Sequence, residues 1–275
     1  MTTLTLEHEH EHEREQAPVR VERAAPAPIP MSRIVAVEAR KSFDTRSGFW
    51  LLASIAITAV IATAAVILWA PDDELTYASF GAAVGFPMAV ILPMIAILSV
   101  TSEWSQRSGL TSFTLVPHRG RVVTAKAVVA VGIAVASMVL AFAIGAVGNL
   151  VGTTIAGTDV VWDMGLDDFL YIVGANVLGL LMGFMLGVLI RNSAGAIVAY
   201  FVYSLVLPSL SEVLAASQSW WGDLRPWVDF NYTQSFLFEG GFTGEQWANL
   251  AVSGGLWLVV PLTIGLWAVL RSEVK

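Results

Sequence analysis

Two stretches of this sequence hold polar side chains of the types that carry out chemistry, and the first lies near the N-terminus. Residues 7–13 read EHEHEHE, so imidazole and carboxylate groups alternate, and both are competent ligands for a transition metal. A flexible repeat lacks the fixed geometry of a dedicated metal site, however, and a solvated tail is the competing interpretation. We therefore predict no metal site and no cofactor bound by this chain.

The second stretch, Thr101–Lys126, reads TSEWSQRSGLTSFTLVPHRGRVVTAK and separates two long apolar runs. Glu103 and Arg107 stand four residues apart, which is the better orientation for an ion pair on a helix. Gly109 is suited to end such a helix, because glycine readily takes the left-handed cap conformation. We therefore expect a short helix near residues 102–108. A membrane-surface loop that is anchored by its basic residues is the alternative.

The composition places both stretches in an integral membrane protein. Of the 275 residues, 56% are hydrophobic and only 13% are charged, and the mean hydropathy is +0.68. Soluble domains contain roughly 45–50% apolar and about 25% charged residues. The absence of cysteine excludes disulfides and thiolate chemistry. The net charge of −7 arises largely outside the apolar runs and indicates no particular partner.

The chain divides into a tail over residues 1–30 and a transmembrane domain over residues 31–275. Dense charge and alternating Pro residues leave the tail little surface to bury, so we expect it to be disordered. The tail contains no apolar run of the kind that forms the core of a signal peptide. Residues 31–46 mix apolar and basic side chains, which favours an amphipathic helix on the membrane surface. A helical extension of the first span is the alternative.

Six apolar runs are long enough to cross a membrane, which takes about 20 helical residues. The expected spans are Phe49–Ala70, Phe80–Val100, Val128–Val151, Phe169–Ile190, Ala194–Leu214 and Leu250–Leu270. Only Arg191-Asn192-Ser193 separates the fourth span from the fifth, so these two must be antiparallel. The expected fold class is an all-α membrane protein with six transmembrane helices.

Basic residues near the span ends are distributed unevenly. Eleven Lys and Arg residues lie on the side that holds residues 31–46, the polar stretch, Arg191 and the C-terminus, whereas the other side has only Arg225. Because basic residues concentrate on the cytoplasmic side, we expect both termini to be cytoplasmic and the chain to lie in the cytoplasmic membrane.

The middle of each expected span lacks Lys, Arg, Asp, Glu and His, and Glu212 near the outer end of span five comes closest. Charged residues inside a membrane usually mark proton or ion relays, so their absence argues against an ion-coupled carrier. The sequence also lacks a Gly-x-x-x-x-Gly-Lys-Ser/Thr phosphate loop and a His-Glu-x-x-His metalloprotease motif. Any uphill transport must therefore take its energy from another chain.

Small residues, prolines and polar residues within the spans are the candidates for a translocation pathway or for dimer packing. Span four has a small residue at every fourth position, which allows a second helix to approach closely. Packing within one bundle and a dimer interface both explain this stripe. Proline can form a hinge or a fixed bend, and polar groups can line a path or join helices by hydrogen bonds. The candidates are Asn176, Gly179, Gly183, Tyr203, Pro87 and Pro93.

The segment before span six, Ala215–Asn249, contains nine aromatic residues. Trp and Tyr favour the membrane–water boundary, so the segment could be an aromatic anchor. Alternatively, Phe230–Phe238 re-enters the bundle and covers the exit of a pathway, because irregular backbone is tolerated at membrane depth where protein shields it.

The polar stretch resembles the permease subunits of ABC-2 type transporters. The matching residues are Glu103, Gly109, Thr111, Leu115, Pro117, Arg119 and Lys126. Two positions depart from the family pattern, since Leu110 interrupts the Gly-Thr pair and Ala125 replaces the glycine before Lys126. The six-span plan, the helix before span one, the short turn after span four and the long segment before span six also match. The resemblance therefore covers Met31–Lys275.

The resemblance implies an exporter of two permeases, as a homodimer or a homologous heterodimer, and two ATPase subunits that bind ATP and Mg²⁺. It implies that Glu103–Gly109 is a coupling helix seated in the ATPase, that Arg33–Asp44 is a connecting helix, and that two short helices re-enter the membrane before span six. The contacts expected with the ATPase subunit are Glu103, Trp104, Gln106, Arg107, Gly109, Thr111, Pro117, Arg119, Arg40 and Lys41.

These expectations describe a transport subunit that is not itself an enzyme and that has the lipid bilayer but no nucleic acid as a further partner. Apolar spans with aromatic flanks suit export of an amphipathic or lipid-like compound. The alternative from another class is a non-transporting membrane protein, such as an immunity or scaffold subunit, which predicts no associated ATPase.

Overall fold

A computed structural model describes residues 29–105 and 119–271 of the chain. The chain divides into the units Met1–Pro30 and Met31–Lys275, and every helix described below lies in the second. The described residues contain no strand, and one isolated backbone bridge pairs Thr76 with Val161.

In these ranges, six helices or continuous helical runs are long and apolar enough to cross a membrane. They are α3 (Arg46–Trp69), α4 (Tyr77–Ser105), α6 (Arg119–Ala156), α7 (Leu166–Ile190), the run α8 (Ser193–Phe201), η2 (Val202–Val206) and α9 (Leu207–Ser217), and the run α12 (Gly244–Gly254), η3 (Gly255–Val259) and α13 (Val260–Arg271). The predicted all-helical, six-span architecture is confirmed, and the protein is a multi-pass membrane protein.

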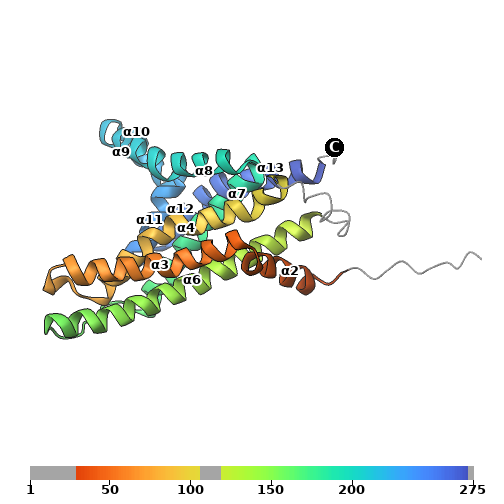
Figure 1. Cartoon of the computed structure of the whole chain (residues 1–275). Coiled ribbons are helices and arrows are strands. Elements are labelled where there is room, and N and C mark those ends of the chain that lie inside the picture. The colour runs from red at the N-terminus through yellow and green to blue at the C-terminus, as the bar shows by residue number, and fades with distance from the viewer. Residues whose placement is uncertain (1–28, 106–118, 272–275) are drawn as a thin grey trace, which may run out of the picture. The chain divides into compact units, whose positions relative to one another are not determined.

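Four shorter helices complete the described chain. They are α2 (Met31–Asp44), the 3₁₀ turn η1 (Asp72–Glu74), α10 (Ser219–Val228) and α11 (Phe230–Glu239). Figure 1 shows α3, α4 and α6 running alongside one another, with α2 beside the first turns of α6.

The turn between α7 and α8 is built from two residues with different tasks. Arg191 adopts the left-handed conformation with φ of 57° and donates its backbone N–H to the Gly187 carbonyl, which ends α7. Asn192 then begins α8, because its side chain accepts a hydrogen bond of 2.9 Å from the N–H of Gly195. Spans four and five are therefore antiparallel neighbours, as the short connection predicts.

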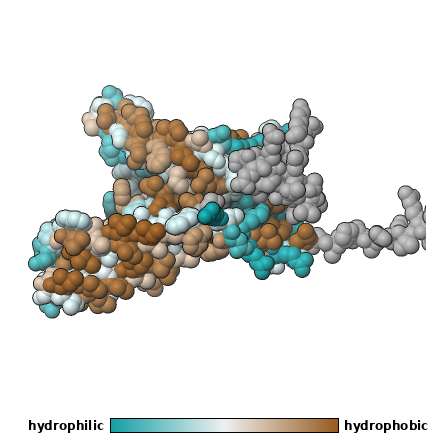
Figure 2. Space-filling view, viewed as in Figure 1, coloured by the Kyte–Doolittle hydropathy of each residue, from teal (hydrophilic) through white to brown (hydrophobic). Residues whose placement is uncertain are grey.

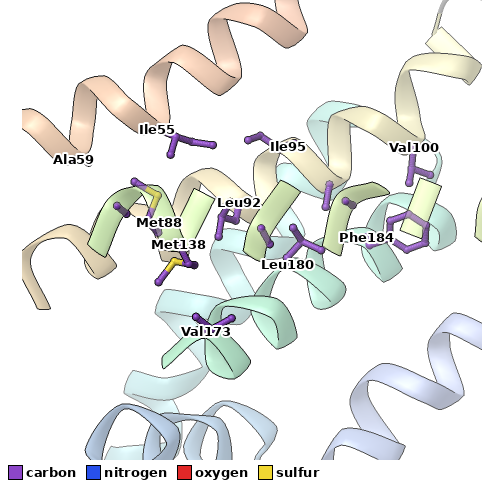
Figure 3. Packing of buried hydrophobic residues seen from close by; sticks show 14 of the residues in the cluster. Ile55, Ala59, Met88, Leu92, Ile95, Val100, Met138, Val173, Leu180 and Phe184 are labelled. Carbon is purple, nitrogen blue, oxygen red and sulfur yellow. The ribbon is translucent and has the colours of Figure 1, made fainter. Parts of the chain in front are cut away.

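Helix α4 occupies the centre of the bundle and contacts α3, α6 and α7. Figure 3 shows this core, in which side chains from all four helices converge. Among its members are Ile55, Met88, Leu92, Met138, Leu180 and Phe184. A second cluster lies on the other side of α7 and joins it to α8, η2, α11, α12 and η3. Helix α7 is thus shared by both halves of the bundle.

Many large apolar side chains on the spans point away from the protein, among them Ile61 on α3 and Val213 on α9, which are 60% and 68% exposed. Figure 2 shows apolar residues over much of the visible face of the spans and hydrophilic residues gathered around α2. In a membrane protein such a surface faces lipid, which is as apolar as the side chains themselves.

The third long helix begins nine residues before the predicted start of span three, because α6 starts at Arg119 and not at Val128. Hydropathy identifies segments that are apolar enough to lie in lipid, and the sequence from Arg119 to Lys126 is too polar to be identified in this way. These residues are helical because tertiary packing supports them: Val122, Val123 and Ala125 are buried. Part of the predicted polar connector is therefore the first two turns of a long helix.

Spans five and six each contain a π-helical segment that the sequence did not predict. Segment η2 precedes Pro208, and segment η3 precedes Pro261, with proline in each case at the second residue of the following helix. Proline lacks an N–H and its ring crowds the carbonyl four residues earlier. A π turn is one local adjustment that relieves this conflict.

Candidate functional site

The two ends of the bundle differ in charge. We call the end formed by α2, the last turns of α4, the first turns of α6 and Arg191 the basic end. The acidic end consists of η1, residues 157–165 between α6 and α7, and helices α10 and α11. Ser105, the last residue of α4, and Arg119, the first residue of α6, both lie at the basic end.

A buried ion pair joins three helices at the basic end. Lys126 of α6 places its Nζ 2.6 Å from Oε2 of Glu38 on α2, and both side chains are more than 90% buried. The same Nζ donates to the backbone carbonyl of Ser99 on α4 at 3.1 Å. Lys41 donates to the second carboxylate oxygen of Glu38 at 2.6 Å. One carboxylate and one ammonium thus hold α2, α4 and α6 together.

The charge on Glu38 depends on this arrangement. Burial by itself would raise the pKa of Glu38, but the charge of Lys126 and hydrogen bonds from Lys126 and Lys41 outweigh it, so the pKa lies below its ordinary value of 4.5. Glu38 is therefore ionised at neutral pH. A buried pair of this kind is costly to break, because removing one partner leaves the other charge uncompensated.

A second contact ties the end of α4 to the turn between α7 and α8. The Thr101 hydroxyl lies 2.8 Å from the Ile97 carbonyl and 2.7 Å from the Ser193 hydroxyl. Because Thr101 uses its single proton on the carbonyl, Ser193 is the donor in the second bond. The residues just before the 106–118 segment are therefore linked to spans four and five as well as to α2 and α6.

The structure describes only some of the residues that are predicted to contact the ATPase subunit. Glu103 and Trp104 lie in the last turn of α4, which runs without a break through Ser105, and Arg119 is the first residue of α6. Arg40 and Lys41 lie on the exposed side of α2. Five of the predicted residues fall outside the described residues, and with them most of the expected coupling helix. They are Gln106, Arg107, Gly109, Thr111 and Pro117.

The small-residue stripe of span four faces helices of the same chain. A Cβ atom on Gly183 would lie 2.7 Å from the carbonyl oxygen of Pro93, and one on Gly187 would lie 3.4 Å from Ile97. Glycine thus allows α7 to pack directly on the backbone of α4. Pro87 lies on the same helix α4 as Pro93. The dimer alternative for this stripe stays a prediction.

Polar groups inside the bundle gather where α7 meets α4, α8 and α11. Tyr200 donates its hydroxyl to the Ala89 carbonyl at 2.8 Å, and Gln234 donates its amide to the Ala175 carbonyl at 2.7 Å. A Cβ atom on Gly179 would lie 3.4 Å from the Gln234 amide nitrogen. Asn176 is also buried and donates to the Ile172 carbonyl of its own helix at 2.9 Å. Gly179 therefore leaves room for two side chains, Tyr200, which joins α8 to α4, and Gln234, which joins α11 to α7.

Tyr203 is buried in the same region of the bundle. Its ring lies between two other aromatic rings, with centroid distances of 6.3 Å to Tyr200 and 6.1 Å to Trp257. The predicted pathway residues Gly179 and Tyr203 thus both lie beside Tyr200, whereas Pro93 and Gly183 lie at the packing contact between α4 and α7.

The acidic end contains a charged cluster that fixes α10 against its neighbours. Arg225 donates to Glu212 at 2.7 Å, lies 3.5 Å from an oxygen of Asp229, and places its guanidinium carbon 3.9 Å from the ring centroid of Tyr232. Asp229 also accepts a hydrogen bond of 2.5 Å from Ser211 on α9. Helices α9, α10 and α11 are therefore cross-linked through one guanidinium group.

Sequence reasoning missed the partners in both charged clusters. Arg225 stood out as the lone basic residue of its side, and its two acidic partners, Glu212 and Asp229, lie within 13 positions of it, which was a signal for the cluster at the acidic end. The partner of Lys126 gave no local signal, because Glu38 lies 88 residues away. Residues 29–105 and 119–271 hold no group of three acidic or His residues arranged for a metal ion, and the 7–13 repeat lies outside them.

Comparison with known proteins adds no name to this arrangement. No protein-family model and no curated protein matches the chain.

Proposed function

We propose that this chain is the transmembrane permease subunit of an ATP-driven exporter of the ABC-2 type. In this proposal the basic end faces the cytoplasm together with both termini, and a separate ATPase subunit docks on the polar segment between α4 and α6. ATP and Mg²⁺ are bound by that subunit. The six-span bundle supports the proposal, together with the resemblance carried by Glu103, Pro117 and Lys126.

The observation that carries the proposal is the way the flanks of residues 106–118 are held. Helices α4 and α6, which this segment connects, are joined to each other and to α2 by Lys126, and α4 is joined to the α7–α8 turn by Thr101. A force on the segment is then passed to several spans at once, because the ends of the helices cannot move independently. This is the property that a coupling site needs.

Two further elements take roles in this proposal. Helix α2 is the connecting helix, and the exposed side chains of Arg40 and Lys41 place positive charge on the side that would meet the ATPase or lipid headgroups. Helices α10 and α11 are the pair of short helices that re-enter the membrane. In support of this role, α11 buries Phe230, Thr233 and Leu237 and contacts α7. A second permease copy completes the transporter, and an amphipathic compound is the cargo.

Co-purification with an ATPase subunit tests the proposal. The chain is co-expressed with candidate Walker-type ATPase subunits, and ATP turnover of any complex that forms is measured in lipid nanodiscs. We expect the complex to form, and we expect the charge reversals Glu103→Lys and Arg107→Glu, combined with deletion of residues 108–116, to abolish coupled turnover. Reversal of Asp72 to Lys at the acidic end is the matched control and should have no effect.

Turnover that survives the changes at the basic end would reject the docking site. Failure of any such ATPase to bind would instead favour an immunity or scaffold subunit.

A further inference from the structure

The side chain of Arg191, in the turn between α7 and α8, carries a positive charge that the described part of the chain does not compensate. It makes no hydrogen bond or ion pair with any described residue, and its Nε atom is buried. The buried cations of the described chain differ in this respect, since Lys126 is paired with Glu38 and Arg225 with Glu212. Because a buried N–H without an acceptor costs free energy, this arrangement is unfavourable for the protein by itself.

The backbone at this position is unfavourable for arginine as well. With φ of 57° and ψ of 19°, Arg191 is the only residue other than glycine in the described ranges that adopts the left-handed conformation. Glycine and asparagine adopt this conformation at lower cost. Neither the backbone nor a contact within the described chain therefore favours arginine here, which indicates a partner outside the chain.

The position of Arg191 between two spans restricts what that partner is. Leu189 and Ile190, the last residues of α7, are 38% and 37% exposed, and apolar sequence resumes at Ala194 on α8. The 25 residues of α7 extend over about 37 Å, which is longer than the roughly 30 Å of a hydrocarbon core. A turn this short cannot reach far from the bilayer. The guanidinium group therefore lies at the level of the lipid headgroups, directly beside side chains that face the acyl chains.

We propose that Arg191 binds the phosphate group of an anionic phospholipid in the leaflet at the basic end. The planar guanidinium group donates two parallel hydrogen bonds to a phosphate, which would satisfy the charge that the chain leaves uncompensated. Ser193 in the same turn is bonded to Thr101 at the end of α4, so a bound lipid would also hold α4 against spans four and five. The inference goes beyond the proposed function and does not depend on it, because lipid binding needs no ATPase.

Thermal unfolding first tests whether the arginine serves the protein or a lipid. The full chain is placed in nanodiscs of phosphatidylcholine alone, or of equal parts of phosphatidylcholine and phosphatidylglycerol. Arg191→Asn removes the charge but tolerates the left-handed backbone, so in phosphatidylcholine its unfolding midpoint should equal or exceed that of the wild type. Phosphatidylglycerol should raise the midpoint of the wild type more than that of Arg191→Asn. A lower midpoint for Arg191→Asn already in phosphatidylcholine would show that the side chain has a partner within the protein, and would overturn the site.

Lipid binding is then measured directly by native mass spectrometry of the full chain in detergent, titrated with phosphatidylglycerol. We expect Arg191→Asn to weaken binding of the first lipid by about fivefold, and Arg191→Lys, which keeps a charge, to weaken it less. Arg33→Asn is the matched control, because it removes an exposed charge on α2 at the same end of the bundle. Its effect should be smaller than that of Arg191→Asn. Inorganic phosphate in the same detergent should not reproduce the rise in unfolding midpoint, since it lacks the acyl chains that lie against Leu189 and Ile190.

Equal lipid affinity in the wild type and Arg191→Asn, or an equal loss in Arg33→Asn, would overturn the site. A rise in midpoint of the same size with inorganic phosphate would overturn the assignment to a lipid. If Arg191→Asn bound lipid normally but no longer co-purified with an ATPase subunit, the arginine would be a protein contact and the lipid site would be rejected. Lipid binding that depends on Arg191 would stand even in a chain that recruits no ATPase.

Discussion

Lys126 and Glu38 are the residues on which the basic end depends. Two charges are removed from water, and each is compensated by the other and by a further hydrogen bond, from Lys41 to Glu38 and from Lys126 to the Ser99 carbonyl. Such a pair is often no more stabilising than well-packed apolar residues would be. Its advantage here is directional, because the bonds define one position of α2 relative to α4 and α6.

Substituting one member of the pair should be far more damaging than substituting both. Lys126→Met leaves the buried carboxylate with Lys41 alone, and we expect a loss of about 3 kcal/mol in the free energy of unfolding. The double variant Glu38→Leu/Lys126→Leu should recover most of this loss. Thermal unfolding in detergent measures both, and Lys41→Met, at a side chain that is 44% exposed, is the control with a small effect. A double variant as unstable as Lys126→Met would contradict this account.

The stability contributed by Glu38 should depend on pH with a defined sign. Its folded pKa is lower than the ordinary 4.5, so the contribution is fully present above about that pH and is lost as the pH falls through the folded value. We expect the difference in unfolding midpoint between the wild type and Glu38→Gln to be constant near neutral pH and to shrink only in acid below 4.5. A difference that already shrinks between about pH 7 and 6 would mean that the carboxylate is not held in its ionised form.

At the scale of elements, the contact between α4 and α7 organises the bundle. Helix α7 presents glycine where it meets Pro93 and Ile97, so two helix backbones approach directly, and both α4 and α7 contribute buried side chains to the two hydrophobic clusters. Pro93 lacks an N–H to bond within α4, and close packing against Gly183 shields that part of the backbone from lipid.

Two glycines of α7 offer a matched test of this contact. In Gly183→Ala the new Cβ would lie 2.7 Å from the Pro93 carbonyl oxygen, whereas in Gly174→Ala it would meet nothing within 4 Å. We expect the first change to destabilise the protein by about 1–3 kcal/mol, because backbone has to move, and the second to be neutral or slightly stabilising. Unfolding midpoints that agree for the two variants would show that α7 does not pack as described.

The elements also differ in how well the sequence predicts them. Apolar runs of the right length predict all six spans, since the bilayer requirement is local. The π turns before Pro208 and Pro261 do not follow from the sequence, because one proline can be accommodated in several ways and neighbouring helices select among them. The early start of α6 at Arg119 depends on buried contacts in the same manner.

At the scale of the whole molecule, the uneven distribution of basic residues predicts an orientation that labelling can check. The sequence has no cysteine, so single-cysteine variants need no background substitutions. Asp72 in η1 and Ser32 in α2 are both exposed and lie at opposite ends of the bundle. In intact cells, a membrane-impermeant maleimide should label Asp72→Cys, whereas Ser32→Cys should require permeabilised cells. The reverse pattern would place the proposed docking segment outside the cell.

Only part of the candidate site could be predicted from the sequence, and the reason is physical. Residue type and position near span ends suffice to single out the polar stretch, Tyr203 and the glycine stripe. The groups that complete their surroundings come from distant segments, as in Glu38 with Lys126 or Tyr200 with Ala89. Such pairs follow from how the spans assemble, and periodicity within one span carries no information about its neighbours.

The π-helical segment η2 acts as a one-residue insertion in the fifth span. Each residue of an α-helix turns the chain by about 100°, so one surplus residue sets the rotation of everything that follows it. Ser211, which donates to Asp229, and Glu212, which accepts from Arg225, lie beyond that point on α9. Removing one residue of η2 would keep the span long enough for the bilayer yet turn both side chains away from α10 and α11. The five-residue segment η2, which lies one to two turns before these side chains, therefore sets the rotation of α9 about its axis relative to α10 and α11.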